Sequence, residues 1–170
     1  MIYNSQGGEV IIMQDNHFPR ILVAIDGSTP SMHTTDYAIS IAIKNNSQIL
    51  VLYVIDVYKY SHLSSSIILA PTFGSEKYLE EMSEAEKLMN KIKEKFKLKV
   101  NDNTKFKELK TEIIEGAKSV ATTIMEYAES NDVNLIIIGS RGRTGFKKLL
   151  LGSVSSSIIK NAHCTVLVIR

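Results

Sequence analysis

Two glycine-containing turns near the end of the chain have the residue types and spacing of an anion-binding loop. Gly139-Ser140-Arg141-Gly142 is followed by nine residues and then by Gly152-Ser153. The first turn follows the apolar run 135–138, which predicts a buried strand, and the second opens a predicted helix over 154–161. Glycines let a ligand approach the main chain closely, and a helix N-terminus presents unpaired N–H groups that favour phosphate. A nucleotide is therefore the first ligand to consider.

The pattern differs from two well-known glycine-rich phosphate motifs. No Lys-Ser or Lys-Thr pair follows the appropriate glycine, so the lysine and the Mg²⁺ ligand of a P-loop are missing. The glycines do not follow G-x-G-x-x-G either, and they come after the fourth predicted strand rather than the first. A plainer interpretation stays open: the glycines form ordinary turns, and Ser153 caps a helix.

Asp26 is the next candidate, because it ends the predicted strand 20–25, where a carboxylate could accept hydrogen bonds from a ribose. The alternative is that Asp26 only forms a turn with Gly27. Ser155 lies near enough to the second turn to reach a phosphate. Basic side chains in the glycine-containing loop could screen phosphate charge or could simply be solvated: Arg141, Arg143, Lys147 and Lys148.

Composition argues against several other classes of function. The net charge of +2 gives no reason to expect nucleic acid or a membrane as partner. The apolar runs are too short to span a bilayer, and residues 1–18 lack the pattern of a signal peptide. Cys164 is the only cysteine, so no intrachain disulfide can form, which is compatible with a cytoplasmic protein.

The histidines and the cysteine do not form a catalytic or metal-binding pattern. His163 and Cys164 precede the last predicted strand and are interpreted as a helix end and a packed thiol. His17, His33 and His62 are scattered along the sequence, and there is no Cys/His cluster with zinc-ligand spacing. We expect no catalytic residue and no protein-ligated metal.

Apolar runs and helical spacing predict five strands that alternate with helices. The predicted strands are 20–25, 48–55, 106–114, 135–138 and 166–169. The predicted helices are one that follows a cap at Ser28 or Thr29, then 76–97, 117–130 and 154–161. The alternation favours a single α/β domain, a doubly wound five-stranded parallel sheet in the order 3-2-1-4-5 with helices on both faces. That order places Asp26 and Gly139 across one crevice at the carboxyl ends of the strands.

Four details complete this prediction. Residues 1–18 are expected to be an N-terminal extension that is poorly ordered, and residues 56–75 a long loop that could cover a site. The helix 76–97 is expected to have a solvated charged face and an apolar stripe: Leu79, Met82, Leu88, Met89 and Ile92. The first helix is expected to pack its inner face on the sheet: Tyr37, Ala38, Ile41 and Ala42.

The sequence resembles the universal stress protein family over nearly its whole length, from about residue 18 to residue 170. The run 19–28 is similar to the family's first strand and turn, and 50–55 to its second strand. The spacing of the glycines is similar to the signature of the family's ATP-binding branch. Thr165 and Asn134 depart from residues that are usual in the family, but neither lies in the glycine-containing loop. The resemblance implies a universal stress protein domain over 19–170, with an adenine-nucleotide alpha-hydrolase-like fold.

The resemblance also implies a role for each matching position. Ala24, Asp26 and Val54 would line the adenosine side, with Asp26 on the ribose and Val54 near the adenine. Main-chain groups of five consecutive residues would surround the phosphates: Gly139, Ser140, Arg141, Gly142 and Arg143. Four further residues would complete the phosphate-binding cradle: Gly152, Ser153, Val154 and Ser155. Both serines would also contribute their hydroxyls. Mg²⁺ or Mn²⁺ would be held mainly by phosphates and water, and a homodimer would form through the last strand.

These observations favour an ATP-binding regulatory protein of the stress response, with at most slow hydrolysis, because no general base is evident. The ligand could also be another adenine nucleotide. Two alternatives stay open at this point. The first is a nucleotidyl- or phosphoryl-transfer enzyme on the same fold, and the second is a dimeric interaction module that binds no nucleotide.

Overall fold

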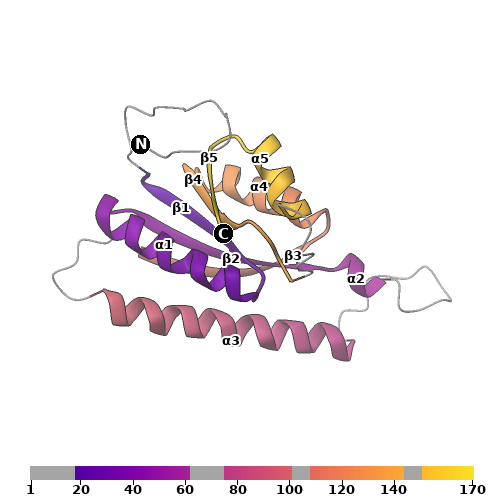
Figure 1. Cartoon of the computed structure of the whole chain (residues 1–170). Helices are drawn as coiled ribbons and strands as arrows, with labels where there is room; N and C mark the ends of the chain where they lie inside the picture. The colour runs from indigo at the N-terminus through magenta and orange to yellow at the C-terminus, as the bar shows by residue number, and fades with distance from the viewer. Residues whose placement is uncertain (1–17, 62–74, 101–107, 144–150) are drawn as a thin grey trace.

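The strands form one parallel sheet in the order β3-β2-β1-β4-β5, as predicted. The computed structural model describes residues 18–61, 75–100, 108–143 and 151–170. Within these ranges every pair of neighbouring strands is parallel (Figure 1). The strands are β1 (Arg20–Ile25), β2 (Gln48–Asp56), β3 (Glu108–Gly116), β4 (Leu135–Gly139) and β5 (Thr165–Ile169). The strand order reverses between β1 and β4, so loops diverge there and leave room for a ligand.

Helices cover both faces of this sheet (Figure 1). They are α1 (Thr29–Asn45), α2 (Tyr58–Ser61), α3 (Glu76–Lys99), α4 (Val120–Ser130) and α5 (Ser153–Asn161). The α1 and α3 side chains pack in one core with one face of the sheet, and those of α4 and α5 pack in a second core with the other face. Ser28, Ser75 and Ser119 cap α1, α3 and α4 by accepting a hydrogen bond from a first-turn N–H group.

The central strand β1 contributes alternate residues to the two cores. Ile21 and Val23 belong to the core under α1 and α3, whereas Leu22 and Ala24 belong to the core under α4 and α5. Three of these side chains are completely buried, and Ala24 is 6% exposed. A strand that is covered on both faces needs apolar residues at every position, which is why β1 and β4 read as continuous apolar runs.

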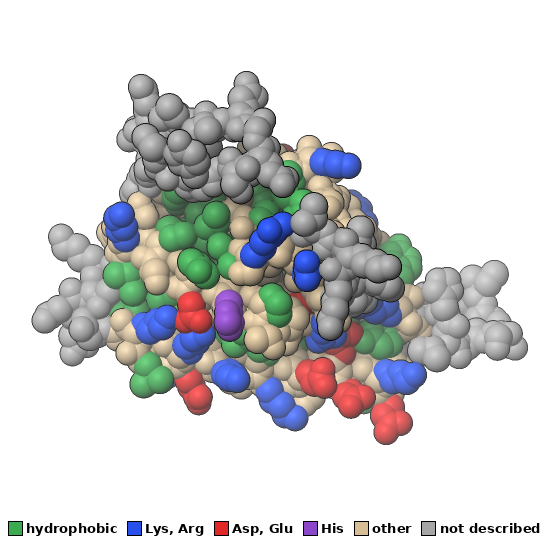
Figure 2. Space-filling model, in the orientation of Figure 1, with side chains coloured by type: hydrophobic (Ala, Val, Ile, Leu, Met, Phe, Trp, Pro, Cys, Tyr) green, Lys and Arg blue, Asp and Glu red, His purple; other side chains and the backbone are tan. Residues whose placement is uncertain are grey.

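The helix faces differ from the prediction at four positions. Tyr37 and Leu79, both expected to point inward, are 54% and 55% exposed. On α3 the side chains of Tyr78 and Glu81 are buried instead, because both are hydrogen-bonded to partners below the helix. The charged outer face of α3 is as predicted, since acidic and basic side chains gather along it in Figure 2.

The described residues that follow β2 are more regular than predicted. β2 extends to Asp56 and is followed by the short helix α2, so part of the expected loop 56–75 has secondary structure. Residues 62–74 of that loop and residues 1–17 of the expected extension lie outside the described residues. Phe18 is described and packs against the core under α1 and α3. Among the described helices, none has the length and apolar character needed to cross a membrane.

Candidate functional site

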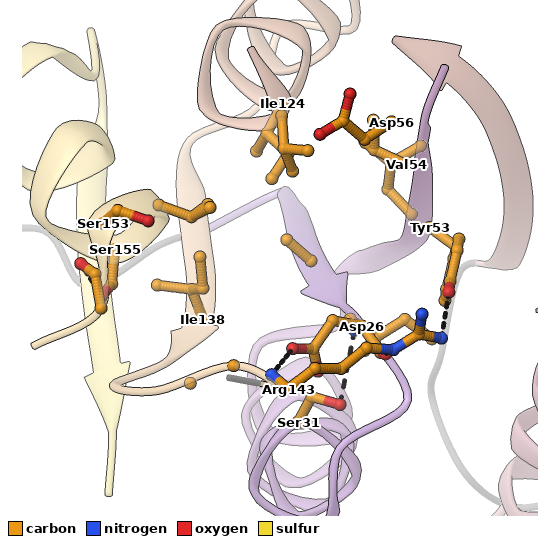
Figure 3. A pocket seen from close by; sticks show the side chains of 18 of the residues that line it. Asp26, Ser31, Tyr53, Val54, Asp56, Ile124, Ile138, Arg143, Ser153 and Ser155 are labelled. Carbon is orange, nitrogen blue, oxygen red and sulfur yellow. Dashed lines mark hydrogen bonds between the residues drawn. The ribbon is translucent and has the colours of Figure 1, made fainter. Parts of the chain in front are cut away.

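A cavity of about 300 Å³ opens at the carboxyl ends of β1, β2 and β4, beside the N-termini of α4 and α5 (Figure 3). One part of its wall is apolar, formed by Ala24, Leu52, Val54, Val120, Ile124 and Ile138. Another part is formed by the two glycine-containing turns and the first turn of α5. Asp26 and Asp56 add carboxylates between these parts. A ligand with an apolar ring at one end and an anion at the other would match this wall.

The first turn of α5 faces the cavity without a side-chain cap. Gly152 is the N-cap residue, and among the described residues no side chain accepts a hydrogen bond from the first-turn N–H groups. Hydrogen bonds to main-chain carbonyls fix this turn. The Gly152 N–H group donates to the Ser140 carbonyl (2.8 Å). The Ser155 hydroxyl lies 3.0 Å from the Gly152 carbonyl and 3.2 Å from the Ser140 carbonyl. The helix therefore presents its positive end to an anion in the cavity.

Asp26 links the turn after β1 to the loop after β4. Its Oδ1 atom accepts hydrogen bonds from the Ser28 main-chain N–H group (3.0 Å) and hydroxyl (2.6 Å). Its Oδ2 atom accepts one from the Arg143 main-chain N–H group (2.8 Å). The turn continues through Gly27, which has φ of +82°. Asp26 thus forms the turn that was the plainer alternative, and Oδ2 still has a lone pair for a ligand hydroxyl.

The Arg143 side chain runs toward β1, β2 and α3. Its Nε donates to the Asp26 carbonyl (2.5 Å), and one terminal nitrogen donates to Glu81 Oε1 (2.9 Å). The other terminal nitrogen donates to the Tyr53 hydroxyl, and the guanidinium lies 5.5 Å from the centre of the Tyr53 ring. The sequence suggested that the Arg143 side chain either screens phosphate charge or is solvated. In the structure it is hydrogen-bonded to protein groups instead.

The Glu81 carboxylate accepts three hydrogen bonds from neighbouring side chains. Besides Arg143 it accepts hydrogen bonds from the hydroxyls of Tyr53 (2.9 Å) and Tyr60. Burial would raise the pKa of Glu81, but these hydrogen bonds and the positive charges of Lys59 and Arg143 outweigh burial, so its pKa lies below the ordinary value. Burial first, and then the hydrogen bond to the Glu81 carboxylate, raise the pKa of Tyr53 and Tyr60.

These pKa directions predict a limited pH range of full stability. The lowered pKa of Glu81 means that its contribution is present above about pH 4.3, the unfolded value, and is lost as the pH falls below it. The raised pKa of Tyr53 and Tyr60 means that their contribution is present below about pH 10 and is lost above it. Urea unfolding from pH 3 to 11 should show both losses. Tyrosine ionisation in the native protein at the ordinary pH would contradict the alkaline part.

Eleven of the twelve predicted site residues lie on the wall of the cavity. The exception is Ser140, which is 5% exposed and donates its main-chain N–H group to the Ile169 carbonyl (2.7 Å). The Ser155 hydroxyl donates to the main-chain carbonyls of Ser140 and Gly152, a contact that the sequence did not predict. Lys147 and Lys148 lie outside the described residues, as do His17 and His62.

Sequence reasoning missed about half of the wall: Ile25, Ser31, Leu52, Tyr53, Asp56, Lys59, Glu81, Val120, Ile124 and Ile138. A signal existed for those at strand ends, since ligands of such sheets lie at the carboxyl ends of strands. No local signal marked Glu81, which lies within a predicted charged helix. Among the described residues, no group of three or more His, Cys, Asp and Glu side chains could hold a metal ion.

Comparison with known proteins places the chain in a family. The sequence model of the universal stress protein family matches residues 17–170. The chain belongs to the universal stress protein family. A universal stress protein of Methanocaldococcus jannaschii is 35% identical over 161 residues, which cover 92% of this chain and 84% of that protein. The prediction of the family from the sequence is thereby confirmed.

Solved universal stress proteins share the fold. The protein UspA from Lactobacillus plantarum has a TM-score of 0.74 and 27% identity, with 91% of this chain and 99% of that chain covered. A universal stress protein from Archaeoglobus fulgidus, solved in complex with dAMP, has a TM-score of 0.62 and 16% identity, covering 92% and 100% of the two chains. The second similarity concerns the fold alone.

Proposed function

We propose that this universal stress protein binds an adenine nucleotide, ATP in the first place, and acts as a regulatory protein with at most slow ATP hydrolysis. One observation carries the proposal: the first turn of α5 lines the cavity, begins at a glycine and is capped by no side chain in the part of the chain that the structure describes. A helix end of this kind needs a partner for its N–H groups and favours an anion. The neighbouring apolar wall then suits a base rather than a second charged group.

The cavity offers a place for each part of the ligand. The adenine would lie on the apolar wall by Val54, with Ala24 beneath the adenosine, and the ribose would reach Oδ2 of Asp26. The phosphates would meet the first turn of α5, with Gly152, Ser153, Val154 and Ser155, and the loop with Gly139, Arg141 and Gly142. Within the described part of that loop, the Arg143 guanidinium is engaged, so Arg141 is the side chain left to approach a phosphate.

A divalent metal ion would be bound through the phosphates of the nucleotide. Because the described residues provide no cluster of metal ligands, Mg²⁺ or Mn²⁺ would take its ligands from phosphates and water. The complex of a universal stress protein with dAMP supports an adenine nucleotide as the ligand class at the level of the fold. The choice of ATP within that class rests on the glycine spacing and on the open helix end.

The last strand is proposed as the dimer contact. In the described sheet β5 lies at the edge and pairs with β4, and all five of its residues are partly exposed. A partly exposed apolar strand at the edge of the described sheet favours pairing with another strand, so a second copy of this chain is the partner we propose. A cytoplasmic location and the extent of the domain, 19–170, also stay predictions.

Thermal unfolding with and without nucleotide tests the proposed function. ATP with Mg²⁺ at 100 times its Kd should stabilise the protein by about 2.7 kcal/mol, which is readily seen as a higher Tm. Calorimetry with ATP, ADP, AMP and cAMP gives the preferred nucleotide, and phosphate release should stay well below about 1 s⁻¹. Turnover at or above that rate would favour the enzyme. Absence of binding to all four nucleotides would favour the interaction module.

A further inference from the structure

The glycine-containing loop is tied to helix α3 by an arginine and a buried glutamate. Arg143 is the last described residue of the loop before the gap at 144–150, and its guanidinium reaches Glu81 at 2.9 Å. The two residues are 62 positions apart in the sequence and come from different layers of the fold. Figure 3 shows the Arg143 side chain extended past Asp26 to the Tyr53 hydroxyl.

Two hydrogen bonds from Arg143 fix the position of Asp26 in the cavity wall. The main-chain N–H group of Arg143 donates to Oδ2 of Asp26, and its Nε donates to the Asp26 carbonyl. The carboxylate proposed to hold the ribose therefore depends on the placement of Arg143. The Gly142 Cα position lies next to the same oxygen, since an added Cβ there would be 2.6 Å from Oδ2.

The environment of Glu81 favours a fixed hydrogen bond to the Arg143 guanidinium. Its side chain is nine-tenths buried, with 10% of its surface exposed, and it accepts hydrogen bonds from two tyrosines and the guanidinium. A buried carboxylate with three donors is costly to displace, because an unpaired charge would remain in the interior. By contrast Glu84, one turn further on α3, is 61% exposed and lies 3.9 Å from the guanidinium.

We infer that Arg143 and Glu81 are positioning residues, which fix the loop 139–143 and Asp26 in the arrangement that receives the nucleotide. The inference rests on the proposed function. Arg143 acts through Asp26 and the loop rather than by touching phosphate, because each of its donor nitrogens already meets Asp26, Glu81 or Tyr53. Nucleotide binding and the packing of α3 are then coupled, and each stabilises the other.

The substitution Glu81→Gln separates positioning from simple electrostatics. A glutamine keeps the size of the side chain but weakens the hold on Arg143, so the Kd for ATP should rise by about 3- to 30-fold. If Glu81 acted only as a nearby negative charge, its removal would tighten the binding of an anion instead. The matched control is Glu84→Gln, which makes the same charge change on the exposed face and should alter the Kd less than about twofold.

Two further measurements keep the inference testable. In a double-mutant cycle, Glu81→Gln should add little to the loss caused by Arg143→Gln, because both break one contact. Without any ligand, hydrogen exchange of the Arg143 amide should become faster in Glu81→Gln and stay unchanged in Glu84→Gln. A general loss of stability would instead speed exchange throughout the core and lower the Tm.

The outcomes distinguish the inference from the proposed function. Weaker ATP binding in Glu81→Gln, together with non-additivity and faster exchange at Arg143, supports the inference. Equal or tighter binding in Glu81→Gln, while the unaltered protein binds ATP, overturns the inference alone. If the unaltered protein binds no adenine nucleotide, the proposed function fails. The exchange measurement then still decides whether Glu81 fixes the loop, and unchanged exchange at Arg143 overturns that too.

Discussion

The substitution Gly152→Asp is expected to abolish nucleotide binding and at the same time to make the free protein more stable. Gly152 has φ of −76° and ψ of 165°, the ordinary conformation of an N-cap residue, so an aspartate there can accept a hydrogen bond from the first turn of α5. The cap hydrogen bond, together with the attraction of the carboxylate to the positive end of the helix, should stabilise the free protein by up to about 1 kcal/mol, or about 2–4 °C in Tm. The same carboxylate occupies the helix end and repels phosphate, so the Kd for ATP should rise at least about 100-fold.

Two further variants at this position separate the causes. An added Cβ at Gly152 would have its nearest neighbours at 3.6 Å, an ordinary contact, so Gly152→Ala should keep ATP binding within about threefold. Gly152→Asn adds a cap without charge and should fall between the alanine and aspartate variants. Calorimetry and thermal unfolding of all three give both quantities. If Gly152→Asp stabilised the free protein and still bound ATP normally, the phosphates would not lie at α5.

The sheet could be predicted from the sequence because each buried strand is marked by its own run of apolar residues. β1 and β4 are covered on both faces, so they are apolar apart from Arg20 at the start of β1 and Gly139 at the end of β4, and their bounds differ from the predicted ones by at most one residue. β3, at the sheet edge, consists mostly of exposed and partly buried residues and runs two residues beyond the predicted end at residue 114. An edge strand is weakly marked, since only part of its surface must be apolar.

The Arg143–Glu81 contact could not be predicted, because nothing local marks it. Apolar spacing on α3 favoured Leu79, yet Glu81 lies inside, since hydrogen bonds satisfy its carboxylate. Patterns of apolar residues miss buried polar groups, whose burial depends on partners that are remote in the sequence. The family resemblance assigned the main chain of Ser140 to the phosphates, whereas its N–H group donates to the Ile169 carbonyl of the neighbouring strand.

The substitution Gly142→Ala is expected to weaken ATP binding by about 10- to 100-fold, the equivalent of a lost hydrogen bond to a charged group. An added Cβ would lie 2.6 Å from Oδ2 of Asp26, which is too close for either to stay in place. Asp26 has little freedom to move, because Ser28 holds its other oxygen and Arg143 holds Oδ2. The collision therefore opens the loop or turns the ribose-binding carboxylate. Gly142→Val, with a larger side chain, should abolish the stabilisation by ATP.

The double variant Gly142→Ala with Asp26→Ala identifies the cause of this loss. With Oδ2 removed, the methyl group at position 142 has room, so the double variant should bind ATP no worse than Asp26→Ala alone. If the two losses added fully, the methyl group would act by blocking the approach of the phosphate, and not through Asp26. If Gly142→Ala bound ATP as well as the unaltered protein does, then neither the loop nor Asp26 would contact the nucleotide. The assignment of the glycine-containing loop to the phosphates would then fail.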